Sequence, residues 1–233
     1  MATELNLLCA GAAKGLVNAL APRLLAEADA TVGGRFGAVG AMREALLAGE
    51  PCDLMVTTAA MADALVAEGR LRGEGRVALG QVRTGVAVRR GAPAPDVSTP
   101  AALAATLRAA DALFVPDTVR STAGQHVAKV LAALGLADAI APRLREFPNG
   151  ATAMAEMAAS GTASAVGITQ VTEILYTDGV ALVGTLPAGF ELSTVYVAAV
   201  SAAAASPRAA ARFAAMLAAD ETAALRERAG FGR

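Results

Sequence analysis

Residues 5–36 read LNLLCAGAAKGLVNALAPRLLAEADATVGGRF, and this stretch decides the fold. A short apolar run, a glycine-containing turn and an amphipathic stretch follow one another, and a second apolar run comes next. This order is typical of the strand and helix units of α/β proteins. It predicts a strand at 5–9, a turn at 11–15, a helix at 16–28 and a second strand at 31–36.

The alternation continues to the end of the chain. Further strands are predicted at 53–58, 82–89, 112–115, 144–147, 163–168, 180–183 and 194–200. Helices are predicted at 41–48, 60–68, after 121, after 149, after 169, at 207–218 and at 221–228. The segment RGAPAP at 90–95 separates two such series. We therefore expect an α/β fold with an open, largely parallel sheet covered by helices.

Charged side chains are balanced and dispersed. The 233 residues include 20 basic and 21 acidic side chains, and 3% of all residues are aromatic. Nucleic-acid binding requires a basic surface, and base stacking requires aromatic side chains, so we expect no nucleic-acid partner. No apolar run approaches the roughly 20 residues that span a bilayer, so we expect no membrane insertion.

We expect neither a cofactor nor a metal. The chain has one histidine and lacks the HExxH, phosphate-loop and dinucleotide-binding motifs. Cys9 and Cys52 lack the spacing of a metal or redox site, which predicts two reduced core thiols. The first residues show no signal-peptide features. A native start there predicts a cytoplasmic protein, and removal of a signal peptide would make it periplasmic.

Gly11, Ala12, Ala13, Lys14 and Gly15 lie between the first predicted strand and helix. Backbone N–H groups at the positive end of a helix dipole bind anions, and Lys14 adds a full positive charge. The alternative is an ordinary tight turn with a solvated lysine. We treat the segment as a candidate anion site.

Ala38, Val39 and Gly40 form a second such turn, without a side-chain donor. Thr57 and Thr58 end the third strand, where their hydroxyl groups can donate to a carboxylate. Threonine is also a common strand residue, which is the alternative explanation. Ligands in open α/β sheets gather at the carboxyl ends of strands, so all five residues are candidate ligand contacts.

Ser121 or Thr122 is the expected N-cap of a helix that carries the only histidine, His126. Capping alone explains the two hydroxyl groups. A histidine in the first turns of a helix that starts at a ligand site lies beside the ligand. A surface or core role is the alternative, and it is the more common one.

Asn149 starts another helix, and Thr169 with Gln170 starts the next, again at strand ends. Asn149 and Thr169 are either ligand contacts or simple caps. Glu173 falls in the first turn of its helix, where an acid that stabilises the helix dipole is the default explanation. It is also a candidate proton donor or acceptor.

Four segments, in order along almost the whole chain, carry a family resemblance. They are Asn18-Ala19-Leu20, GEPCDLMV at 49–56, the run from Pro116-Asp117 to Ser121-Thr122-Ala123-Gly124, and the run from Asp220-Glu221 to Gly230-Phe231. Together they resemble the molybdate-binding branch of the type II periplasmic solute-binding proteins. The resemblance implies two α/β lobes, residues 1–82 with 196–233 and the inserted residues 83–195. It also implies a ligand in the cleft between the lobes, at helix N-termini.

The first two loops depart from the molybdate-binding pattern. Family members that hold tetrahedral oxyanions use hydroxyl residues there, whereas this chain has GAAKG at 11–15 and GAVGA at 37–41. We therefore expect a small organic carboxylate, a di- or tricarboxylate, as the ligand. The same fold contains enzymes similar to aconitate isomerase.

The resemblance thus implies two competing functions. The favoured one is a cytosolic isomerase that moves a C=C bond by an allylic proton shift. His126 and Glu173 are then the base and acid, and Lys14 stabilises the developing enolate-like charge. The alternative is a non-catalytic receptor that is exported and hands its ligand to the permease of an ABC importer. A ligand-sensing protein without its effector domain is a third, weaker possibility.

Overall fold

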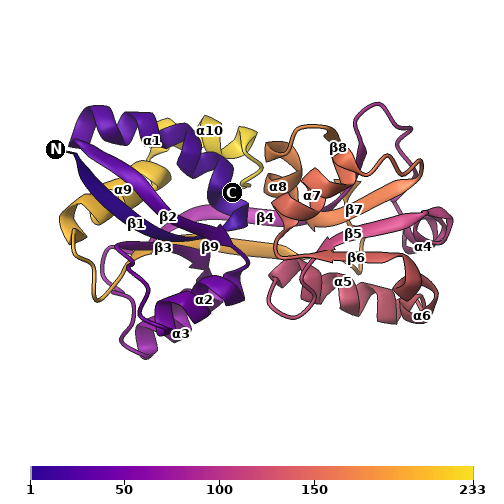
Figure 1. Ribbon diagram of the computed structural model, residues 1–233, viewed down its shortest axis with the longest axis horizontal. Helices are drawn as coiled ribbons and strands as arrows, with labels where there is room; N and C mark the ends of the chain where they lie inside the picture. Colours follow the sequence, from indigo (N-terminus) through magenta and orange to yellow (C-terminus); the bar gives the residue numbers. More distant parts are fainter. Residues whose placement is uncertain (1, 233) are drawn as a thin grey trace. The chain divides into compact units, whose positions relative to one another are not determined.

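A computed structural model describes residues 2–232 of the chain (Figure 1). The chain forms two compact units. Unit 1 comprises the residues up to Val82 together with those from Thr194 onward, and unit 2 runs from Arg83 to Ser193. The chain leaves unit 1 within strand β4 (Val77–Arg89) and returns to it at the start of strand β9 (Ser193–Val200).

Unit 1 is built on a mixed sheet. Its strand order is β2-β1-β3-β9-β4, with β1 (Thr3–Ala10), β2 (Ala30–Gly37) and β3 (Leu54–Thr58). β1 pairs in parallel with β2 and β3, whereas β9 pairs with β3 in the antiparallel direction. The predicted largely parallel sheet is therefore wrong at β9. This strand returns directly from unit 2, without the crossover helix that a parallel neighbour needs.

Helices cover both faces of this sheet. They are the 3-10 helix η1 (Gly11–Ala13), α1 (Lys14–Ala28), α2 (Val39–Leu47), α3 (Ala59–Ala67), α9 (Pro207–Ala218), the 3-10 helix η3 (Asp220–Thr222) and α10 (Ala223–Arg228). Side chains of β1 alternate between two cores: Leu7 packs with α1 and α9, and Leu8 packs with α2 and α3. Cys9 and Cys52 are buried and free, as predicted. Burial raises the pKa of the Cys52 thiol to about 12.

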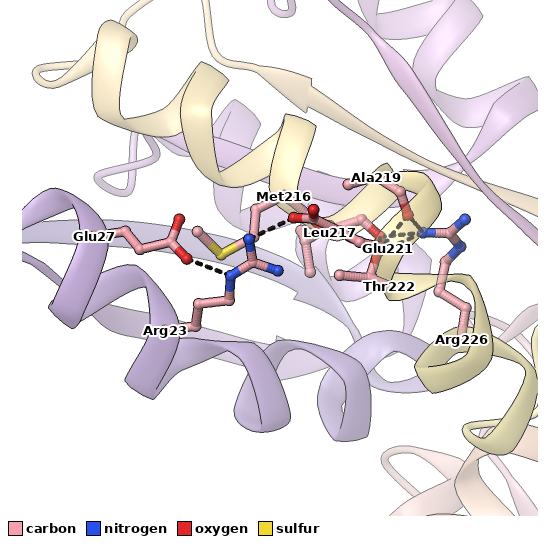
Figure 2. Close-up of polar contacts among 8 residues, drawn as sticks. All are labelled: Arg23, Glu27, Met216, Leu217, Ala219, Glu221, Thr222 and Arg226. Atoms are coloured by element: carbon pink, nitrogen blue, oxygen red, sulfur yellow. Dashed lines mark hydrogen bonds and ion pairs between the residues drawn. The ribbon is translucent and has the colours of Figure 1, made fainter.

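Two arginines of unit 1 make polar contacts around the C-terminal helices (Figure 2). Nη1 of Arg226, in α10, donates to two carbonyl oxygens at the end of α9 and to Thr222 Oγ1, at 2.7–3.0 Å. The last carbonyl groups of a helix lack intrahelical partners, so Arg226 satisfies acceptors that α9 leaves open. Arg23, in α1, forms ion pairs with Glu27 and Glu221. The ion pair with Glu221 links α1, which starts at the candidate site, to η3.

Unit 2 also contains both parallel and antiparallel strand pairs, within the same nine-stranded sheet. The strand order in this unit is β4-β7-β5-β6, and β8 also pairs with β4. The strands are β5 (Ala112–Pro116), β6 (Leu144–Phe147), β7 (Ala165–Gln170) and β8 (Val180–Thr185). β5 is parallel to β6 and β7, and β4 is antiparallel to β7 and β8. Within unit 2, the expected parallel arrangement is found among β5, β6 and β7.

The helical segments of unit 2 include three that the sequence analysis missed. The segments, in chain order, are α4 (Pro100–Ala109), α5 (Thr122–Ala133), α6 (Ala137–Ile140), the 3-10 helix η2 (Ala141–Arg143), α7 (Gly150–Ala159) and α8 (Val171–Tyr176). The missed ones are α4, α6 and η2. α4 and α5 pack on one face of the sheet, and α7 and α8 pack on the other. α4 was not predicted, although Thr99 accepts from the N–H of Ala102 at 3.1 Å and Pro100 follows it. A capping threonine before a proline is a helix-start signal.

Two predicted boundaries are wrong at the candidate site. The turn predicted at 11–15 is η1 and the start of α1, and the turn predicted at 37–40 shrinks to Ala38 between β2 and α2. β2 extends to Gly37 because it stays paired with β1 through Ala10. Thr169 and Gln170 end β7, and Gln170 is also the N-cap of α8, so the next helix starts after Thr169 as predicted.

Candidate anion-binding site

The carboxyl ends of β1, β2 and β3 meet at one edge of unit 1. Ala10 is the register partner of Gly37, and Cys9 is the partner of Val56. The residues that follow these strands are therefore neighbours: Gly11 after β1, Ala38 after β2, and Thr57 at the end of β3. We call this group the unit 1 edge, and it contains the predicted residues of both early loops.

Alanine precedes both helical starts at the unit 1 edge. Ala10 is the N-cap of η1 and Ala38 is the N-cap of α2, and neither makes a side-chain capping hydrogen bond. An alanine side chain carries no polar atom that could accept from the first-turn N–H groups. Ala10 and Ala38 therefore supply no side-chain acceptor to the first-turn N–H groups of η1 and α2. The positive ends of the helix dipoles attract an anion.

Lys14 brings a full positive charge to the same edge. It is the first residue of α1, directly after η1, and Gly15 follows it. Its Nζ lies 5.9 Å from the centroid of the Phe36 ring, near the end of β2. This distance is within the range of a cation–π contact. The contact holds the ammonium group beside the strand ends, and the sequence pattern gave no sign of the role of Phe36.

The two threonines of β3 differ in their hydrogen bonding. Thr58 is the N-cap of α3, and its Oγ1 accepts from the N–H of Met61 at 3.3 Å. Thr57 is 0% exposed, and its Oγ1 has no hydrogen-bond partner within the described chain. A buried hydroxyl group without a partner costs free energy, so such groups call for an explanation. Contact with a bound ligand would provide one at this edge.

Unit 2 has a comparable edge at the ends of β5, β6 and β7. Pro116 is the register partner of Phe147, and Phe114 is the partner of Gly167, which makes the following segments neighbours. α5, α7 and α8 start there. We call this group the unit 2 edge; its predicted members are Ser121, Thr122, Asn149, Thr169, Gln170 and Glu173.

Two of the three helices at the unit 2 edge, α5 and α7, are capped by side chains, whereas Gln170, the N-cap of α8, makes no side-chain capping hydrogen bond. Ser121 Oγ accepts from the N–H of Gly124 at 3.4 Å, and Thr122 is the first residue of α5. Asn149 Oδ1 accepts from the N–H of Thr152 at 2.9 Å and from its hydroxyl group at 3.0 Å. The capping roles that the sequence analysis offered as an alternative are therefore present for Ser121 and Asn149.

Glu173 supplies a carboxyl group to the start of α7. The side chain is 6% exposed, and Thr169 Oγ1 donates to its Oε2 at 2.6 Å. Further donors are the backbone N–H groups of Ala151, Gly150 and Gln170. Burial raises the pKa of this carboxyl group above its ordinary value, and the hydrogen bonds oppose that shift. A β-carbon at Gly150 would overlap Thr169 Oγ1 and Glu173 Oε2, so only glycine admits this approach.

His126 lies in the second turn of α5 and is half-buried. Its Nε2 is 2.8 Å from the carbonyl oxygen of Phe190, a residue 64 positions away in the segment between β8 and β9. This contact was not predicted, because a backbone carbonyl leaves no signature in a sequence. It orients the imidazole ring of the only histidine in the chain.

Thr84 is a polar residue of unit 2 that the sequence analysis did not select. It pairs with Gln170 across β4 and β7, at the unit 2 edge. Its side chain is 1% exposed, and Oγ1 has no hydrogen-bond partner in the part of the chain that the structure describes. Threonine is frequent in strands, so no sequence signal distinguished Thr84 from an ordinary strand residue.

Neither a metal centre nor a membrane segment is evident among residues 2–232. No cluster of at least three His, Cys, Asp or Glu side chains there is arranged to hold a metal ion. No described helix combines the length and the apolar character required to cross a bilayer.

A family model of bacterial extracellular solute-binding proteins matches residues 5–232. The chain belongs to this family. The match covers the two-unit fold almost from end to end, and it confirms the resemblance on which the sequence analysis relied.

This member of the family is also similar to an enzyme. It is 31% identical over 148 residues to aconitate isomerase from a Pseudomonas species. The match covers 63% of the present chain and 54% of the relative, so the aligned region spans about half the length of that enzyme.

Solved structures share the fold of this solute-binding protein at low sequence identity. The periplasmic molybdate-binding protein of Azotobacter vinelandii has a TM-score of 0.82 at 17% identity, covering 98% of this chain and 99% of that one. The sulfate-binding protein SubI of Mycobacterium tuberculosis has a TM-score of 0.75 at 18% identity, covering 98% and 86%. These likenesses establish the mixed α/β periplasmic-binding-protein fold.

Proposed function

We propose that this protein binds a small organic carboxylate and isomerises it by moving a C=C bond through proton transfer. The proposed binding rests on the unit 1 edge. There, η1 and α2 have alanine N-caps that make no capping hydrogen bond, and Lys14 adds a positive charge. The similarity to aconitate isomerase supports the proposed reaction. The ligand class is a di- or tricarboxylate.

A carboxylate suits the donors of the unit 1 edge. Backbone N–H groups and an ammonium group both stabilise an anion, and hydrogen bonds to ionised groups are the stronger kind. The unpartnered hydroxyl group of Thr57 adds a donor that a carboxylate oxygen can accept from. Both loops lack the hydroxyl side chains that the molybdate pattern uses, which favours a carboxylate over a tetrahedral oxyanion.

The proposed reaction needs few groups. A base removes a proton from a carbon next to a carboxylate, and the C–H electron pair spreads into that carboxylate as an enolate-like charge. A proton then adds at the other end of the three-carbon unit, so the double bond moves and no oxidant is required. We assign the proton transfers to His126 and Glu173, and the stabilisation of charge to Lys14 and the N–H groups.

The competing function is a non-catalytic receptor of an ABC importer. The family description, with its extracellular solute-binding proteins, favours this candidate. A receptor needs only tight binding and must be exported, whereas the isomerase can work in the cytoplasm. Fractionation of cells that express the native gene separates a periplasmic from a cytoplasmic protein.

Ligand conversion is the decisive test. A thermal-shift screen of molybdate, sulfate and a panel of di- and tricarboxylates identifies stabilising ligands, because a ligand that binds the folded state raises its stability. Each stabilising carboxylate is then followed by proton NMR in deuterated water. Isomerised, deuterium-exchanged product is expected, and its formation should stop in the variants His126→Gln and Glu173→Gln.

Two other outcomes overturn parts of the proposal. A carboxylate that binds and stays unchanged makes the protein a receptor and removes the catalytic roles of His126 and Glu173. Stabilisation by molybdate or sulfate alone contradicts the ligand class itself.

A further inference from the structure

The contact between His126 and Phe190 fixes the protonation pattern of the imidazole ring. A carbonyl oxygen can only accept a hydrogen bond, so the ring nitrogen 2.8 Å from it must carry hydrogen. In the neutral ring one nitrogen is a donor and the other an acceptor. Nε2 is thus the donor, and the lone pair belongs to Nδ1.

The segment that carries Phe190 is held at both ends by Thr84. The N–H of Leu186 donates to the Thr84 carbonyl at 3.1 Å, and the N–H of Thr84 donates to the Leu192 carbonyl at 3.0 Å. The residues between them form a closed loop on β4. Their anchorage limits how far the Phe190 carbonyl can move.

A tight turn inside this segment sets the direction of that carbonyl. The N–H of Phe190 donates to the carbonyl oxygen of Pro187 at 2.9 Å, and the N–H of Gly189 donates to Glu191 Oε2 at 2.6 Å. Gly189 has φ of +86°, a backbone conformation that glycine adopts readily and other residues adopt at a cost. The turn at 187–191 is therefore specified by its own hydrogen bonds and by one glycine.

We propose that the segment 186–192 is a positioning element that selects the Nε2–H tautomer of His126 and leaves Nδ1 as the atom that takes the substrate proton. The catalytic part rests on the proposed isomerase function. In that reaction the C–H proton moves to Nδ1, the imidazolium keeps its Nε2–H bond to Phe190, and Nδ1 loses the proton again when the product forms. In catalytic histidines in general, a hydrogen bond made by one ring nitrogen fixes the tautomer and leaves the other nitrogen to act as the base.

The tautomer can be measured without any knowledge of the substrate. His126 is the only histidine, so nitrogen NMR of histidine-labelled protein gives signals of one imidazole ring. At a pH at which the ring is neutral, we expect the Nε2–H form to dominate in the whole protein. Neutral free histidine already favours the Nε2–H form, so a dominant Nδ1–H form, or an Nε2–H population no larger than that of free histidine under the same conditions, overturns the proposal.

Gly189→Ala tests the positioning role. A methyl group there meets no atom within 4 Å, so the variant strains the positive-φ turn without a steric overlap. The matched control is Gly161→Ala, which also has positive φ and open space and lies in the same unit. We expect Gly189→Ala to raise the Nδ1–H population and to lower kcat about tenfold with a smaller change in KM. Gly161→Ala should change neither the tautomer nor kcat.

Glu191→Ala provides a second route if Gly189→Ala folds poorly. It removes the acceptor of the Gly189 N–H and should shift the tautomer in the same direction. Equal tautomer populations in the wild type and both loop variants overturn the positioning role. The protein could convert no carboxylate while its His126 ring is Nε2–H and changes tautomer in the loop variants. That result supports the positioning role and contradicts only the proposed function.

Discussion

The unit 1 edge and the unit 2 edge differ in how the N–H groups at their helix starts are capped. In both units, helices start at the carboxyl ends of parallel strands and present N–H groups that lack intrahelical partners. Unit 1 places alanine at the N-caps of η1 and α2. Unit 2 caps α5 with Ser121, and α7 with Asn149 and the buried carboxyl group of Glu173.

The difference indicates which edge attracts an outside anion. At the start of α7 the chain's own carboxyl group already receives the N–H groups of Gly150 and Ala151. At the starts of η1 and α2, no side chain of the N-cap residue performs that task, whereas Thr58 caps α3. A ligand carboxylate at unit 1 would therefore do what Glu173 does in unit 2. The following predictions test this equivalence.

Removal of the internal carboxyl group should have the largest effect. In Glu173→Ala, the Thr169 hydroxyl group and the first N–H groups of α7 lose a buried acceptor. We expect the free energy of unfolding to fall by about 3 kcal/mol, as measured by urea denaturation. Sulfate should then stabilise the variant more than the wild type, because an added anion can replace the lost group.

Glu156→Ala is the matched control, since Glu156 lies exposed on the same helix, α7. It should change the unfolding free energy by less than about 0.5 kcal/mol and leave the response to sulfate unchanged. Equal stability of the two variants would show that Glu173 does not cap α7.

A carboxylate at the N-cap of α2 should strongly weaken ligand binding at the unit 1 edge. Ala38→Asp gives α2 an N-cap acceptor and puts a negative charge where the ligand carboxylate is proposed to bind. Like charges cost several kcal/mol, so we expect Kd for the stabilising carboxylate to rise at least about 100-fold, measured by calorimetry. Thr99→Asp is the control, because it exchanges one good N-cap for another at α4. Unchanged affinity in Ala38→Asp would place the ligand elsewhere.

Loss of the lysine charge should have a smaller effect. Lys14→Met keeps most of the apolar length of the side chain and removes the ammonium group that lies over the Phe36 ring. Affinity for the carboxylate should fall about tenfold, and the dependence of Kd on salt should weaken. Lys129→Met, on the exposed side of α5, should leave both quantities unchanged. If Lys14→Met binds the carboxylate with normal affinity, Lys14 does not contribute to the ligand site. The alternative of a solvated lysine in an ordinary turn would then hold.

Local patterns were sufficient for much of the fold. α9 was predicted at 207–218 and is observed at Pro207–Ala218, because a proline at the first position and a regular apolar stripe are both written in adjacent residues. α4 was missed although its Thr99 cap and Pro100 carry the same kind of signal. The direction of β9 could not be predicted, since it depends on the return of the chain from unit 2.

The candidate site was only partly predictable, for a related reason. The strand-end rule selected the residues of both edges, but it could not separate capped from uncapped helix starts. Glu173 reaches the start of α7 from the next helix, and Phe190 reaches His126 from 64 residues away. Such contacts depend on tertiary packing, and one of the two partners is often a backbone atom without a residue preference.

The pH dependence of stability tests whether burial or hydrogen bonding dominates at Glu173. Burial raises the pKa of this carboxyl group in the folded protein above its ordinary value. Between the unfolded and folded pKa values, the folded state then binds more protons, so the contribution of Glu173 to stability is present at low pH and is lost as pH rises. Urea denaturation of the wild type and Glu173→Gln at several pH values should show the wild-type advantage shrinking as pH rises through that window. If the wild-type advantage grows with pH instead, the donors from Thr169 and α7 hold Glu173 as an anion. Glu173 would then be a built-in carboxylate in unit 2, equivalent to the ligand carboxylate proposed for unit 1.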